Sequence, residues 1–238
     1  MSNEILLVIN LVVVYLMTIG AYWLFGKKGV ICWNIFATIA ANIEVMILIK
    51  AFGMEQTLGN ILFASTFVAT DILSENHGKK EASLAVKTGI AASFAFIVIS
   101  HIWLMYSPSE NDFVMPAMVQ VFSNTPRIML AGFLVYGIVQ FFDVWIYHKI
   151  WDFTTRKTGE SKKLLWIRNN GATIISQLIN AILFNVFAFY GVYDIKTLVS
   201  IIVSTFVIYV ITSLADTPVI YLARNLKNRN HYELLNRK

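Results

Sequence analysis

The chain is poor in charged residues and in cysteine, and each shortage excludes a class of protein. Only 14% of its 238 residues are charged, whereas 57% are hydrophobic. A soluble domain carries about 25% charged residues, so this chain has too little polar surface to cover a globule in water. Lipid is therefore the expected solvent for much of it. The single cysteine, Cys32, excludes an internal disulfide and a metal site built on cysteine.

Motifs of several enzymes and motors are also missing. The sequence has no His-Glu-x-x-His, no Gly-x-Ser-x-Gly and no Gly-x-x-x-x-Gly-Lys. We therefore expect no enzyme activity, no ATP hydrolysis by this chain, no cofactor and no metal. The net charge of +5 does not indicate nucleic acid, because the basic residues lie in loops between apolar runs.

What the sequence does contain is long apolar runs. A helix needs about 20 mostly apolar residues to cross a bilayer, and the runs are continuous rather than alternating, which excludes a β-barrel. Two connecting segments, 107–126 and 152–163, are expected to be loops. The predicted fold is all-α, a polytopic membrane protein with seven transmembrane helices: Ile5–Phe25, Val30–Ile49, Leu58–Leu73, Ala82–Tyr106, Ile128–Ile150, Leu164–Tyr190 and Leu198–Leu222.

The basic residues orient these helices. With the N-terminus outside, sixteen of the 19 lysines and arginines lie in inner segments and three in outer ones. This bias predicts an N-out, C-in protein of the cell (inner) membrane. We expect an extra N-terminal helix over residues 1–28, a six-helix transporter core over 29–225 and a basic cytoplasmic tail over 226–238.

The six core helices form two triplets of opposite orientation, which is the arrangement of a 3+3 inverted repeat. The middle member of each triplet is the short one, and we expect Gly78 to end the first and Gly171 to interrupt the second. Interrupted helices in corresponding positions indicate a transporter binding site, because the freed backbone groups need a polar cavity.

Polar residues recur on one face of several predicted helices. A charged group in the bilayer costs at least about 2.5–3.5 kcal/mol, so each one needs a reason. Spacings of i, i+4, i+7 and i+11 place side chains on one helix face, and four such faces are expected to converge on a common interior. The four faces comprise Phe67, Asp71 and Ser74; Tyr136, Gln140, Asp143 and Tyr147; Asn170, Thr173, Gln177, Asn180 and Phe184; and Thr205, Tyr209, Thr212 and Asp216.

A structural role is the alternative for any single amide or hydroxyl, since such groups also join helices inside membranes. Glu44 lies near the outer end of its helix, where snorkelling or a structural pair would account for it equally well. The candidate substrate-binding residues are Asn42, Phe67, Asp71, Tyr136, Gln140, Asp143, Asn170, Gln177, Asn180 and Asp216. The candidate gate or coupling residues are Glu44, Glu75, Arg168 and Asn169.

Several blocks occur in the order found in one known family. They are Ala69–Glu75 with Gly78–Ala82, Gln140–Asp143, Leu165–Asn170 with Ser176–Ile179, and Asp216–Pro218. Over residues 30–225 the chain resembles the queuosine precursor transporter family, also called the VUT family. One departure is Asn180, where many relatives carry Asp, and it leaves the substrate variant and any proton coupling open.

The resemblance implies import of 7-deazaguanine bases, such as 7-cyano- or 7-aminomethyl-7-deazaguanine or queuine. In this hypothesis Asp143 or Asp71 binds the N–H edge of the base, while Gln140, Gln177 and Asn180 read its carbonyl side. Expected partners are this purine-like substrate, membrane lipid, a second copy in a homodimer, and a proton or sodium as coupling ion, with no nucleic acid. The alternatives are a substrate-binding component of an energy-coupling-factor vitamin importer, or a seven-span channel or receptor.

Overall fold

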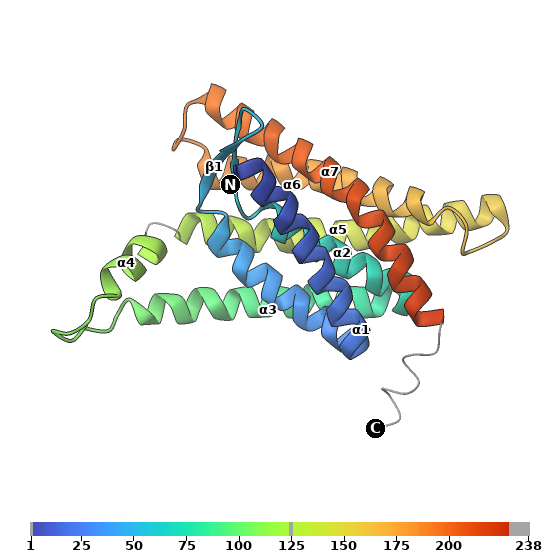
Figure 1. Cartoon of the computed structure of the whole chain (residues 1–238), viewed down its shortest axis with the longest axis horizontal. Helices are drawn as coiled ribbons and strands as arrows, with labels where there is room; N and C mark the ends of the chain where they lie inside the picture. Colours follow the sequence, from blue (N-terminus) through green and yellow to red (C-terminus); the bar gives the residue numbers. More distant parts are fainter. Residues whose placement is uncertain (1, 124–125, 229–238) are drawn as a thin grey trace.

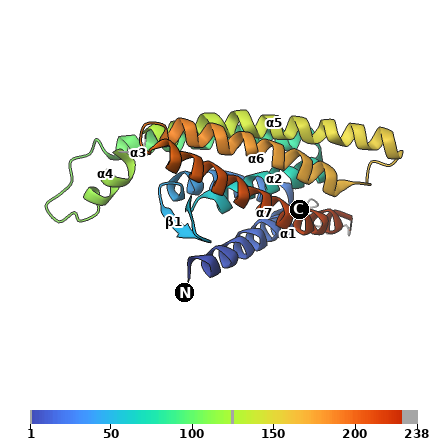
Figure 2. The same cartoon turned by 90° about the horizontal axis from the view of Figure 1, so that it is seen from above.

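The computed structural model describes residues 2–123 and 126–228, and this part of the chain is predominantly helical. The last ten residues of the predicted basic tail lie outside the described residues. Its helices are α1 (Asn3–Glu44), α2 (Asn60–His77), α3 (Lys79–Trp103), α4 (Met115–Ser123), α5 (Pro126–Thr158), α6 (Leu165–Phe189) and α7 (Ile195–Asn228). Figures 1 and 2 show the long helices gathered into one bundle, with α4 beyond the end of α3.

Helix α1 consists of two helical arms joined at Gly26. The backbone of Gly26 is non-helical, with φ 62° and ψ −145°. That positive φ is favourable for glycine, which has no Cβ to clash with the backbone. The chain reverses there, so that the first arm (residues 3–25) and the second arm (residues 27–44) run in opposite directions (Figure 1). The first two predicted spans are therefore separate helical arms.

The end of the bundle beside the N-terminus carries structure that the sequence analysis missed. A hairpin of β1 (Leu48–Ala51) and β2 (Met54–Thr57) pairs antiparallel, with Leu48 opposite Thr57. The second predicted span is therefore too long, because Leu48 and Ile49 belong to a strand. The segment 107–126 is also not all loop, since α4 lies within it; its first turn is capped by Asp112, whose Oδ2 accepts from the Met115 N–H at 2.8 Å.

Two further expectations were wrong at the opposite end. Helix α6 is continuous from Leu165 to Phe189, so Gly171 does not break it. A single glycine costs a helix only about 1 kcal/mol, which packing against α5 and α7 readily offsets. Helix α5 runs on to Thr158, through much of the expected 152–163 loop. Gly78 does end α2, as expected, with φ at 85°.

Helix α2 is the centre of the bundle. Nearly all of its side chains are buried, and it packs against α1, α3, α5 and α7. A helix surrounded by protein does not face lipid, so it can be short and rich in polar residues. It is accordingly not among the five described helices that are long and apolar enough to cross a bilayer.

Those five helices are α1, α3, α5, α6 and α7, and large apolar side chains cover their outer faces. Leu16, Phe94, Trp145, Ile182 and Val203 are examples, each well exposed. Exposed apolar surface on this scale is typical of a protein whose surroundings are lipid. The chain is therefore a multi-pass membrane protein with its polar side chains directed inward.

Candidate functional site

The interior contains three polar layers along the bundle axis. We call them the outer cavity, the carboxyl layer and the inner ion-pair network, where outer and inner only name the two ends after the orientation expected from the basic residues. The outer cavity lies at the end of the bundle where the β hairpin leads into α2, since Gly59 and Asn60 line it. The ion-pair network lies at the opposite end of α2, beside the turn between α5 and α6.

The outer cavity has a volume of about 30 Å³ and combines amides with aromatic rings. The Asn180 side chain donates from Nδ2 to the Tyr209 hydroxyl at 3.0 Å. The Phe63 ring stands 6.3 Å from that of Tyr209. Close packing with α5 is possible because residue 132 is glycine: a Cβ there would lie 2.4 Å from Asn42 Oδ1. The cavity is lined by Ala41, Asn42, Val45, Gly59, Asn60, Phe63, Gly132, Asn180, Phe184 and Tyr209.

The carboxyl layer lies about two helical turns further in. Asp71, Asp143 and Asp216 come from α2, α5 and α7, are almost fully buried and are electrostatic neighbours of one another. Asp71 Oδ2 accepts from the Thr173 hydroxyl at 3.0 Å, and Asp216 Oδ1 accepts from Asn169 Nδ2 at 2.7 Å. The polar helix faces therefore converge in the interior of the bundle, as the sequence predicts.

Several atoms of this layer have no hydrogen-bond partner among the described residues. They include both carboxylate oxygens of Asp143, Oδ1 of Asp71 and Oε1 of Gln177. Buried polar atoms in native proteins are nearly always paired with protein, water or ligand. The layer therefore has unused hydrogen-bonding capacity deep in the bundle.

The side-chain amides of Gln140 and Asn170 are hydrogen-bonded to neighbouring helices. The Gln140 amide donates from Nε2 to the Thr66 hydroxyl at 2.7 Å, and its Oε1 accepts from Thr70 at 3.2 Å. Asn170 donates from Nδ2 to the Thr217 hydroxyl at 2.7 Å. Both therefore join helices in the closed bundle, and each would have to exchange a partner to bind a ligand.

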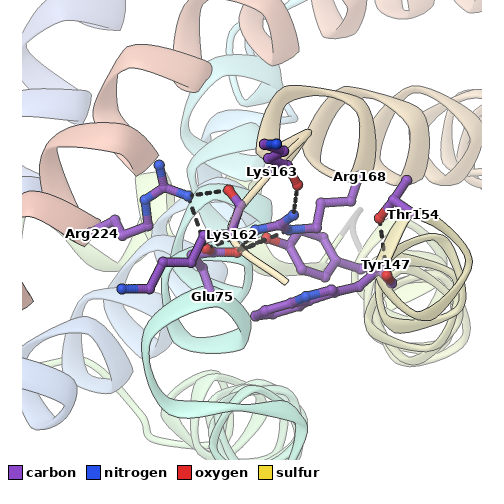
Figure 3. A network of polar contacts seen from close by, with 8 residues as sticks. Glu75, Tyr147, Thr154, Lys162, Lys163, Arg168 and Arg224 are labelled. Carbon is purple, nitrogen blue, oxygen red and sulfur yellow. Dashed lines mark hydrogen bonds and ion pairs between the residues drawn. The ribbon is translucent and has the colours of Figure 1, made fainter. Parts of the chain in front are cut away.

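The inner ion-pair network is centred on Glu75 and Arg168 (Figure 3). Arg168 binds the carboxylate through two nitrogens, Nε at 3.0 Å and Nη2 at 2.7 Å from Oε2, and the two side chains are 0% and 3% exposed. The Tyr147 hydroxyl donates to Glu75 at 3.1 Å, and Arg224 lies 3.5 Å from it. The Arg168 guanidinium also lies 4.3 Å from the centre of the Trp151 ring.

This network joins four helices at the inner end of the bundle. Glu75 comes from α2, Tyr147 from α5, Arg168 from α6 and Arg224 from α7. The two arginines also donate to the Lys163 and Lys162 carbonyls of the α5–α6 turn. Bidentate arginine–carboxylate pairing is among the stronger polar contacts in proteins. The arrangement therefore closes the inner end of the carboxyl layer.

One candidate gate residue, Glu44, lies away from the others. Glu44 ends α1 beside the start of α2, a whole helix length from Glu75 and Arg168, so those three do not form one cluster. The Tyr136 hydroxyl accepts from Asn34 Nδ2 at 2.9 Å, which connects α5 to the second arm of α1. Phe67 lies beneath Phe63, with ring centres 5.7 Å apart.

Sequence reasoning missed several lining residues. Phe63 lies one turn before Phe67 on the same face of α2, and a face extended in that direction would have included it. Asn60, at the start of α2, continues the same face. Arg224 lies two turns beyond Asp216 on α7. Within residues 2–123 and 126–228, no group of three or more His, Cys, Asp or Glu side chains is arranged to hold a metal ion.

Fold and site together define the class: a multi-pass helical membrane protein with a polar interior. The model of a family described as "Putative vitamin uptake transporter" matches residues 57–223. A Bacillus subtilis (strain 168) protein described as "Probable queuosine precursor transporter" is 34% identical over 202 residues, covering 85% of this chain and 86% of the relative. The chain belongs to this family, which is one of transporters and not of enzymes. No solved structure matches it.

Proposed function

We propose that this chain imports queuosine precursors, which are 7-deazaguanine bases such as 7-cyano-7-deazaguanine, 7-aminomethyl-7-deazaguanine or queuine. The family and the relative's description support a small-molecule carrier of this kind. The observation that carries the proposal is the buried Asp143 carboxylate: neither oxygen accepts a hydrogen bond of standard geometry from the described residues, and the Ser176 hydroxyl is a neighbouring donor.

The chemistry of the base matches the layers. One edge of a deazaguanine presents N–H donors, which suit the free oxygens of Asp143 and Asp71. Its carbonyl suits amide donors such as those of Gln177 and Asn180. On its way to the carboxyl layer its flat ring would pass the aromatic lining of the outer cavity, where Phe63 and Tyr209 offer ring faces.

The proposed cycle is alternating access. A cavity of about 30 Å³ holds one or two waters and is far too small for a bicyclic base. The outer cavity must therefore widen to admit substrate, while the inner ion-pair network keeps the other side shut. Release to the cell would then require Glu75 and Arg168 to separate.

We further propose seven spans, N-out and C-in, with an extra first span over residues 1–28 before a six-span core. The reversal of α1 at Gly26 supports counting its arms as two spans. An inverted repeat is supported by packing: in each triplet the middle helix, α2 or α6, packs against both of its sequence neighbours. A homodimer, and coupling to a proton or sodium, complete the proposal.

Uptake by cells that produce the protein tests it. Cells with the wild-type chain should accumulate labelled 7-cyano-7-deazaguanine, and Asp143→Asn should abolish accumulation without reducing the amount in the membrane. Asp194→Asn is the matched control, because Asp194 lies in the exposed outer turn between α6 and α7. Undiminished uptake by Asp143→Asn would remove Asp143 from the site.

A further inference from the structure

A second cavity lies outside the transport path, between the two arms of α1. Its volume is about 940 Å³, and apolar side chains of both arms dominate its lining. The first arm contributes Met17, Leu24 and Phe25, whereas the second contributes Trp33 and Phe36. We call it the α1 groove.

The groove exists because the first arm is attached to other helices. The Tyr15 hydroxyl donates to the Thr212 carbonyl of α7 at 2.8 Å, and the Tyr22 hydroxyl lies 3.1 Å from His77 Nε2 at the end of α2. Near the turn the arms come close, since a Cβ on Gly29 would lie 2.1 Å from the Ala21 carbonyl oxygen. The groove is therefore a fixed feature of the packing.

Its closed end is basic. Lys27 and Lys28 lie at the turn and line the groove. Lys27 is paired with Glu81 at 2.8 Å, whereas Lys28 forms no ion pair within the described part of the chain and is exposed. An anion bound at this end would therefore meet one uncompensated charge directly and a second that Glu81 only partly neutralises.

The dimensions fit one leaflet. From Met17 to Gly26 the first arm rises by about 14 Å at ~1.5 Å per residue. That is close to half of the ~30 Å hydrocarbon core. Apolar side chains thus line the groove over the depth of an acyl chain, and the two lysines lie at the depth of the headgroup.

We propose that the α1 groove binds an anionic phospholipid of the inner leaflet, with its phosphate at Lys28 and Lys27 and an acyl chain between the arms. The leaflet assignment rests on the proposed N-out orientation. Basic pockets between helices on the cytoplasmic side recognise anionic headgroups in the same way. The lipid would stabilise the first arm against the core without entering the transport path.

Lipid retention by the purified protein, measured by native mass spectrometry, tests this independently of transport. The probes are dioleoyl-phosphatidylglycerol and dioleoyl-phosphatidylcholine, offered as an equal mixture. Wild type should retain the glycerol lipid preferentially. The preference should fall by about fivefold in Lys28→Gln and further in the double variant with Lys27→Gln. Lys157→Gln, an exposed lysine in the last turn of α5, is the matched control and should behave as wild type.

A second pair of variants tests the acyl-chain part of the groove. Cys32 is exposed and lines the groove, so Cys32→Trp should fill it and reduce retention of both lipids. Val203→Trp places the same ring on a lipid-facing position of α7 and should not. Equal retention of the two lipids by wild type, equal effects of Lys28→Gln and Lys157→Gln, or displacement of the lipid by inorganic phosphate alone would each overturn the proposal.

Discussion

Removing the Glu75 carboxylate should open the inner end of the bundle. Both partners of the Glu75–Arg168 pair are almost fully buried, and breaking a buried pair costs about 3–5 kcal/mol because it leaves an uncompensated charge. The pair is expected to form only while the inner end is closed. Its loss in Glu75→Gln should therefore shift the equilibrium between the inward-closed and inward-open states toward the inward-open state by roughly 100-fold or more. The double variant Glu75→Gln with Arg168→Gln should shift it less, because the fully buried charge of Arg168 is then absent and only Arg224, which is partly exposed, loses its partner.

Thiol accessibility measures this shift. Cys32→Ser gives a chain without cysteine, and Ser176→Cys then places a thiol in the carboxyl layer, next to Asp143. A membrane-impermeant maleimide added to inside-out vesicles should label this thiol at least tenfold faster in Glu75→Gln. Glu81→Gln is the matched control. The side chains of Glu81 and its partner Lys27 are 26% and 46% exposed, so this ion pair contributes only about 0–1 kcal/mol of stability. Unchanged labelling in Glu75→Gln, or equal acceleration in Glu81→Gln, would refute the gate.

Three further variants test the outer cavity. Tyr209→Phe removes the acceptor of the buried Asn180 amide, which costs about 1–3 kcal/mol of stability. The midpoint of thermal unfolding of this variant in detergent should therefore fall below that of wild type. An unchanged midpoint would argue against this hydrogen bond. Gly132→Ala forces Asn42 to move and should raise KM for uptake, whereas Gly20→Ala, with open space around it, should not. Equal KM values in the two variants would exclude Asn42 from substrate binding. Asn180→Asp introduces the acid that the resemblance to the family leads us to expect at this position, and it should alter the pH dependence of uptake, measured as initial rates across the neutral range. Superimposable profiles would exclude this position from coupling.

Helix type and the polar interior were predictable because both follow from local patterns. Tyr136, Gln140, Asp143 and Tyr147 share a face at helical spacing, and a polar face in lipid must turn inward. All four are buried in the structure. The continuity of α6 was not predictable from Gly171, because neighbouring helices decide whether a glycine breaks a helix or only weakens it.

The pairing of Glu75 with Arg168 could not be predicted from local pattern either. Glu75 and Arg168 are 93 residues apart in the chain, so nothing in the spacing of either helix relates them. The β hairpin was missed for a related reason: its strands are four residues each, too short for alternation to distinguish them from loop. Asn60 and Phe63 lie outside the predicted polar face of α2, which begins at Phe67.

The most direct test of the account is calorimetric binding of deazaguanines and vitamins to the purified protein and to its Asp143→Asn variant. We expect saturable binding of a 7-deazaguanine base by wild type, with binding lost in Asp143→Asn and retained in Asp194→Asn. Equal binding by wild type and Asp143→Asn, or binding of a vitamin in place of every deazaguanine, would contradict it.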